Sequence, residues 1–157
     1  MMKITRPISL IILIFLGIFT GCSPAGVPVY SVTGTVTYQG KPVENALVSL
    51  IPESTEIRGA SAMTNGNGQF VVVTQGAKEN GAMLGEYKIL VTKLIEVDDS
   101  GKEVIREQVK YNPNNNHNEI QYQQKNLLPK KYTKRETTNL TVTVGKQKNH
   151  FKLALTD

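Results

Sequence analysis

Strict two-residue alternation between glycine-rich turns is the feature of this sequence that most constrains its fold. From residue 30 to residue 38, Val32, Gly34, Val36 and Tyr38 fall on one face of an extended chain, while serine and threonine fall on the other. A period of two is typical of a half-buried β-strand, because successive side chains of a strand point to opposite faces. Beyond residue 30, no segment convincingly repeats its apolar residues at the spacing of an amphipathic helix. The sequence therefore predicts an all-β protein.

Short turn motifs separate the alternating segments. Gln39 to Pro42 forms one turn, Asn65 to Gly68 contains two Asn-Gly pairs that favour a type I′ hairpin, and Gly145 to Lys148 joins the last two segments as a further hairpin. The predicted strands cover residues 30–38, 46–52, 59–64, 69–74, 87–91, 140–144 and 151–155. We therefore predict a seven-stranded antiparallel β-sandwich domain over residues 30–156.

Residues 94–135 interrupt this pattern before the last two strands. The stretch from Tyr111 to Lys125 is dominated by asparagine and glutamine. Such a composition cannot bury enough apolar area to offset the entropy of ordering the chain. We therefore predict a mobile polar insertion between the fifth and sixth strands.

The first 21 residues have the organisation of an export signal. Lys3 and Arg6 precede an apolar run from Ile8 to Phe19, and small residues follow at once. A helix made from that run would span about 18 Å, which is too short for about 30 Å of bilayer hydrocarbon. The sequence predicts that residues 1–21 are a cleaved signal peptide.

The end of that segment, Phe19-Thr20-Gly21-Cys22, resembles a bacterial lipobox. The resemblance implies that the thiol of Cys22 is lipidated and that the protein is exported and anchored to a bacterial membrane in the cell envelope. Residues 22–29 contain two prolines, a glycine and no periodicity, so we predict that they form a tether. Cys22 is the only cysteine of the chain, and it stands where the motif needs it. The alternative is an ordinary secretory signal followed by an unmodified cysteine.

The mature sequence resembles the carboxypeptidase regulatory-like, or transthyretin-like, domain, especially in small lipoproteins of planctomycete bacteria. The matching motifs are Val32–Tyr38, Gly40–Ala46, Thr64–Phe70, Gly85–Ile89, Leu127–Tyr132 and Leu140–Val144. The resemblance implies a prealbumin-like sandwich without peptidase activity, which belongs to a separate catalytic domain in carboxypeptidases. Asn65 and Asn67 stand where the family usually has aspartate, which argues against a cation site at this turn.

The sequence offers no constellation of catalytic residues. His117 lies in the polar insertion and His150 is out of phase with the apolar residues of the last strand, so we expect both in solvent. The adjacent carboxylates of Asp98 and Asp99 diverge on a turn. No phosphate-binding loop, nucleophile elbow or cofactor fingerprint is present. We therefore predict a protein that is not an enzyme and binds neither a cofactor nor a metal.

The formal charge of the chain is +5, and the basic excess is concentrated in residues 125–157. A basic segment of this kind could contact anionic lipid, anionic polysaccharide or nucleic acid. Alternatively, residues such as Lys146, Lys148 and Lys152 are solvent-facing positions of strands. Export argues against nucleic acid as a partner.

Two functions fit these observations: a structural or protein-interaction module of the envelope, and a carbohydrate-binding module of the cell surface. Carbohydrate platforms rely on exposed aromatic rings, and the chain has no tryptophan. That absence favours the first function, with an envelope protein or polysaccharide as the partner. The candidate contact residues combine ring faces with positive charge, and they are Tyr122, Tyr132, Lys130, Lys131, Lys134 and Arg135.

Overall fold

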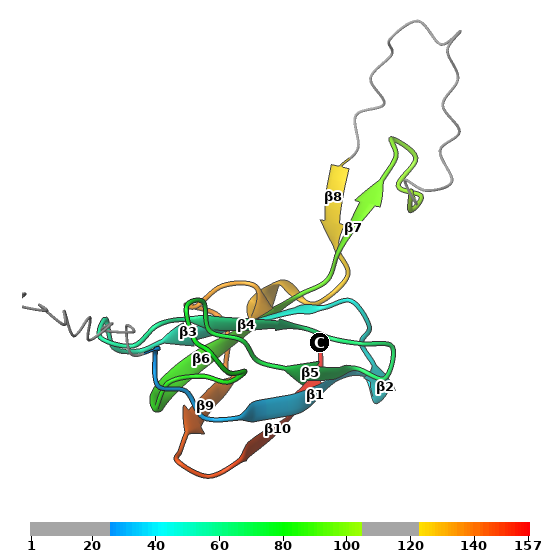
Figure 1. Cartoon of the computed structure of the whole chain (residues 1–157). Coiled ribbons are helices and arrows are strands. Elements are labelled where there is room, and N and C mark those ends of the chain that lie inside the picture. The colour runs from blue at the N-terminus through cyan, green and yellow to red at the C-terminus, as the bar shows by residue number, and fades with distance from the viewer. Residues whose placement is uncertain (1–25, 105–122) are drawn as a thin grey trace, which may run out of the picture.

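Two sheets pack face to face in the computed structural model, which describes residues 26–104 and 123–157 (Figure 1). The first sheet contains β1 (Val32–Tyr38), β2 (Lys41–Pro42), β5 (Gln69–Val71) and β10 (Asn149–Leu155). The second contains β3 (Leu47–Pro52), β4 (Ala60–Met63), β6 (Gly85–Thr92) and β9 (Thr141–Val144). No α-helix occurs in the described residues. The predicted all-β class, with sheets packed as in a sandwich, is confirmed.

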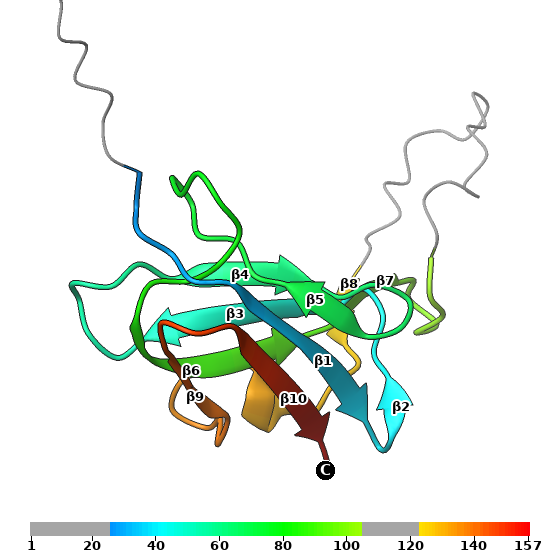
Figure 2. The same ribbon diagram turned by 60° about the horizontal axis from the view of Figure 1, so that its bottom comes forward.

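The core forms where the inward faces of the two sheets meet. Val32 and Val36 of β1 are fully buried, as the alternation predicts, while the threonines between them are partly exposed. Val48 and Leu50 of β3 and Tyr87 of β6 face them from the second sheet and are equally buried. Figure 2 shows β1 lying between β5 and β10, so its inward face is central to the core.

The first predicted turn has the geometry that its residues favour. Gln39 and Gly40 both have positive φ, at 49° and 76°, and Tyr38 pairs with Lys41 across the turn. Positive φ at both central residues is the signature of a type I′ turn. The turn therefore connects β1 to the two-residue strand β2.

The Asn-Gly turn lies where the sequence places it, but the predicted type I′ hairpin is wrong. Only Gly68 of the four turn residues has positive φ, at 72°. The side-chain oxygen of Asn65 accepts hydrogen bonds from the backbone N–H groups of Asn67 (3.0 Å) and Gln69 (2.9 Å), an arrangement that replaces the expected geometry. The turn carries the chain from β4 in one sheet to β5 in the other.

The predicted hairpin between the last two strands is also wrong. β9 pairs with β6, whereas β10 crosses to the other sheet and pairs with β1 in parallel. The buried side chain of Asn149 directs this crossing, because its amide bonds the backbone of Gly145 (2.9 Å) and of Gln147 (2.8 Å). A strand's alternation fixes its inward face but not its partner, so the sequence did not reveal the crossing.

The region predicted as an insertion contains ordered structure at both ends. β7 (Leu94–Val97) pairs with β8 (Gln123–Asn126), and together they form a two-stranded ribbon that projects from the sandwich (Figure 1). The chain returns to the core at Leu128, and Tyr132 follows in a 3-10 turn, η2 (Lys130–Tyr132). The predicted end of the insertion at residue 135 therefore needs correction. Residues 105–122, which include Tyr111 and Tyr122, lie outside the described residues.

Candidate functional site

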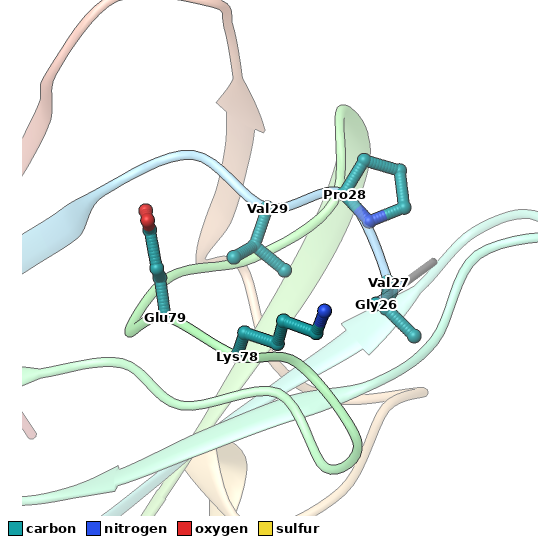
Figure 3. Close-up of a pocket in the computed structure, with 6 residues that line it drawn as sticks. All are labelled: Gly26, Val27, Pro28, Val29, Lys78 and Glu79. Carbon is teal, nitrogen blue, oxygen red and sulfur yellow. The ribbon is translucent and has the colours of Figure 1, made fainter. Parts of the chain in front are cut away.

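The described chain begins beside one end of β1. Tyr30 and Ala82 exchange backbone hydrogen bonds of 2.8 and 3.0 Å, which tie the start of β1 to the loop between β5 and β6. Figure 3 shows the segment from Gly26 to Val29 over that loop, with the Lys78 side chain reaching towards Gly26. We call this the tether end of the sandwich. The predicted lipidation site, Cys22, precedes it and lies outside the described residues.

The other end of β1 lies beside the base of the ribbon. Tyr38, at the end of β1, lines a pocket of about 300 Å³ together with Lys93 and Leu127, which flank the ribbon. We call this the ribbon end. Since a strand rises about 3.3 Å per residue, the seven residues of β1 separate the two ends by roughly 20 Å.

The pocket at the ribbon end combines an apolar floor with a cationic rim. Val43 and Leu128 are nearly fully buried and form the floor, while Leu127 is largely exposed at its edge. Lys41 and Lys93 also line the pocket, and none of its described lining residues is acidic. Such a pocket can hold an anionic group that carries an apolar body.

Asn126 fixes the base of the ribbon. Its side-chain oxygen accepts hydrogen bonds from the backbone N–H groups of Lys93 (2.9 Å) and Leu128 (3.3 Å). The backbone N–H of Leu127 donates to the carbonyl of Lys93 at 2.9 Å. These bonds hold Lys93 and Leu127 beside each other, although they are far apart in sequence.

The four residues of the predicted basic group differ in their contacts. Lys131 donates to the main-chain oxygen of Asp157 at 2.7 Å, and its ammonium lies 5.2 Å from the centre of the Tyr132 ring. Arg135 forms an ion pair with Glu53 at 2.7 Å. Lys130 and Lys134 are exposed. Two of the four predicted cations therefore hold the protein's own structure together.

The expectation that Tyr132 is exposed is wrong. Only 2% of its surface is accessible, and the ring belongs to the core. Its hydroxyl donates to the carbonyl of Thr156 (3.2 Å) and accepts from the Thr156 N–H (3.1 Å). Composition alone did not reveal this burial, because Leu127, in the same short segment, is exposed while Leu128 and Tyr132 are buried.

A hydrogen-bonded clasp holds the last residue against the β1–β2 turn. The carboxylate of Asp157 accepts a hydrogen bond from the Tyr38 hydroxyl and another from the Gln39 amide at 2.7 Å. These bonds lower the pKa of the Asp157 carboxyl, with the Tyr38 bond as the largest cause. The same bond raises the pKa of Tyr38, because the carboxylate favours the protonated phenol. Together with Lys131, these residues secure the end of the chain to both η2 and β1.

The clasp predicts a specific loss of stability in acid. A carboxyl group whose folded pKa is depressed stabilises the fold above its unfolded pKa, near 3.8, and this contribution is lost as pH falls through the folded value. We expect Asp157→Asn to be less stable than the native chain at neutral pH and to lose less stability between about pH 5 and about pH 2. Urea denaturation across that range measures the difference. Parallel pH curves for the two proteins would contradict the clasp.

The described residues contain no group of three or more histidine, cysteine, aspartate or glutamate side chains placed to hold a metal ion. The Asp98 carboxylate accepts hydrogen bonds from Ser100 (2.6 Å from its hydroxyl) and from the Lys102 N–H (3.0 Å), which lower its pKa. This is the solvated turn that the sequence predicts. His150 is exposed beside Thr33, at 3.0 Å from its hydroxyl.

No family model matches the chain, and neither a curated protein nor a solved structure matches it. Within residues 26–104 and 123–157, no helix has the length and apolar character needed to cross a bilayer.

Proposed function

We propose that the chain is a lipid-anchored, non-catalytic protein of the bacterial cell envelope that acts as a protein-interaction module of the carboxypeptidase regulatory-like type. The observation that carries the proposal is the separation of the two ends of β1. The described chain enters at the tether end, while the pocket and the ribbon lie at the other end of the same strand.

The short tether limits how far the tether end of β1 can lie from the membrane. Cys22 precedes Gly26 by so few residues that a fully extended chain between them reaches only about 14 Å. Lipid on Cys22 therefore keeps the tether end close to the membrane. The ribbon end lies about 20 Å farther along β1, which leaves it accessible to an envelope partner.

The residues of the ribbon end indicate which chemical groups a partner must carry. Lys41 and Lys93 flank an apolar floor, which suits an acidic protein segment with an apolar side chain. A carbohydrate platform finds less support there, because Tyr132 and Tyr87 are buried and Tyr38 is engaged with Asp157. We therefore propose an acidic protein segment as the partner.

The anchor is tested by the variant Cys22→Ser. Two acyl chains hold a protein stably on a membrane, so we expect the native protein in the membrane fraction and Cys22→Ser in the soluble exported fraction. Fractionation and immunoblotting measure the distribution. Retention of Cys22→Ser on membranes would refute anchoring through this cysteine.

The binding end is tested by site-specific photo-crosslinking in intact envelopes. A photoreactive residue at Leu94 or Leu127 should give adducts with an envelope protein, whereas one at Lys146, in the turn between β9 and β10, serves as the exposed control. We expect Lys41→Gln with Lys93→Gln to reduce the adducts several-fold, and added salt to do the same. Lys146→Gln with Lys148→Gln is the charge-matched control. Equal loss in both double variants would show that net charge, not the pocket, determines binding.

A further inference from the structure

One continuous stretch of the sequence, from Gly59 to Ala77, contains no charged residue, although 20% of the whole chain is charged. It covers β4, the Asn-Gly turn and β5. Burial explains the absence of charge at only half of these positions, because alternate side chains of β4 and β5 point outward. The outward face of these strands therefore lacks the charges that exposed strands usually carry.

That face is apolar as well as uncharged. Met63 of β4 is 58% exposed, and Val71 and Val73 at β5 are 50% and 48% exposed. The two strands meet at a seam between the sheets, where Ser61 and Val73 exchange backbone hydrogen bonds of 3.0 and 2.8 Å. Leu47 of β3, also exposed, is paired with Met63. We call Met63, Val71 and Val73 the seam face.

Basic residues flank the seam face at the tether end, and an acidic residue lies at its other end. Arg58 and Lys78 flank the uncharged stretch at the tether end, where the Arg58 guanidinium donates to the carbonyl of Gln75 at 3.4 Å and Lys78 lies against Gly26 (Figure 3). An acidic residue, Glu79, follows Lys78 directly, and its side chain points away from the Lys78 ammonium (Figure 3). Glu44 lies at the other end of the face, beside the Asn-Gly turn.

The tether is close to this face. The backbone N–H of Val72 donates to the carbonyl of Val32 at 3.0 Å, so β5 runs beside the very start of β1. From there the chain leads back through Tyr30 to Gly26 and the predicted lipid site. A membrane that holds Cys22 is therefore within reach of the seam face, and the basic pair lies between them.

We propose that the seam face rests on the membrane to which the chain is tethered. Its apolar side chains enter the headgroup region, and Arg58 and Lys78 bind anionic lipid headgroups. The inference depends on the proposed lipid anchor and adds an orientation to it. A tether alone leaves the domain free to rotate, whereas this contact fixes which side of the sandwich faces the bilayer.

The absence of tryptophan makes a direct test possible. The full chain carrying Val71→Trp, purified from the membrane fraction and reconstituted in vesicles of phosphatidylethanolamine and phosphatidylglycerol, should show blue-shifted emission and at least about two-fold stronger quenching by brominated lipid than Leu94→Trp. Leu94 is the matched control, since it is 56% exposed at the ribbon end. Met63→Trp provides a second probe if Val71→Trp does not fold. Equal quenching at both ends would overturn the proposal.

The role of Arg58 and Lys78 in membrane binding is tested in the same vesicles. Arg58→Gln with Lys78→Gln should reduce the quenching of the Val71→Trp probe, while Lys130→Gln with Lys134→Gln should leave it unchanged. A probe that is blue-shifted but not quenched by brominated lipid would show that a second copy or another protein covers the face, and this outcome overturns a membrane contact.

A failure of the proposed lipid anchor can be distinguished from a failure of the proposed membrane contact. If the full chain is recovered from the soluble fraction, the proposed natural lipidation is wrong. The free Cys22 thiol is then coupled to a maleimide lipid, and the same quenching is measured. Strong quenching of Val71→Trp supports the seam face as a membrane-binding surface even in that case, and weak quenching refutes it.

Discussion

Tyr132→Ala should lower the free energy of unfolding by about 3–5 kcal/mol, the range for removal of a buried aromatic side chain. The ring is 2% exposed and packs in the core, where its loss leaves a cavity. The substitution also removes the two hydrogen bonds between the Tyr132 hydroxyl and Thr156, which hold the end of β10. Urea denaturation in the Cys22→Ser background measures the loss.

Matched variants separate the ring from the hydroxyl and from the surface charge. Tyr132→Phe keeps the ring and should lose about 1 kcal/mol, the usual contribution of a hydrogen bond. Lys130→Ala, at the exposed start of η2, should change stability by less than about 0.5 kcal/mol. If Tyr132→Ala were as mild as Lys130→Ala, the ring would not be part of the core.

Side-chain alternation predicted most strands of the two sheets and their inward faces, but not β2 or the ribbon strands β7 and β8. Val32, Val36 and Tyr87 are buried as the pattern requires, because solvation decides the face of a strand locally. Which strands pair with each other depends on contacts between distant parts of the chain. β10 lies parallel to β1, more than a hundred residues away in sequence, and the Asn149 amide donates to the carbonyl of Ser31, a contact that no local pattern encodes.

The candidate site was harder to predict than the fold, for two physical reasons. Charge shows that Lys131 and Arg135 are cations, but it does not show that Lys131 donates to the main chain of Asp157 or that Arg135 pairs with Glu53. The pocket at the ribbon end could not be read from the sequence either, because Lys41 is brought to Lys93 and Leu127 only by the folded sheets. Spacing along the chain carries no information about such a site.

The uncharged stretch differs from the candidate site, because its lack of surface charge is visible directly in the sequence. Alternation assigns one half of Gly59–Ala77 to the core and the other half to the surface, and the absence of charge applies to both halves. A strand that needed only solubility would carry lysine or glutamate at its outward positions. Its composition therefore points to a contact, and the structure adds that the contact surface lies beside the tether.

Gly34 should accept a side chain only at a large cost in stability, because a Cβ atom there would meet neighbours on both sides of β1. Gly34 is buried at the centre of β1, between β5 and β10. A Cβ atom there would overlap the ring of Phe70 and the backbone carbonyl of Phe151. Overpacking of a core typically costs about 1–3 kcal/mol. We expect Gly34→Ala near the top of that range, because one obstructing atom belongs to the backbone, and Gly34→Val to prevent stable folding.

A double-mutant cycle with Phe70→Leu identifies the cause. Phe70→Leu alone removes part of a buried ring and should be destabilising, but it also makes room for the methyl group of Gly34→Ala. The double variant should therefore be more stable than the sum of the two single losses predicts, by about 0.5–1 kcal/mol or more. Urea denaturation of the four proteins in the Cys22→Ser background measures this coupling. Simple additivity would show that the Phe70 ring is not the obstacle, and a harmless Gly34→Ala would contradict the close approach of β1, β5 and β10 that holds the first sheet together.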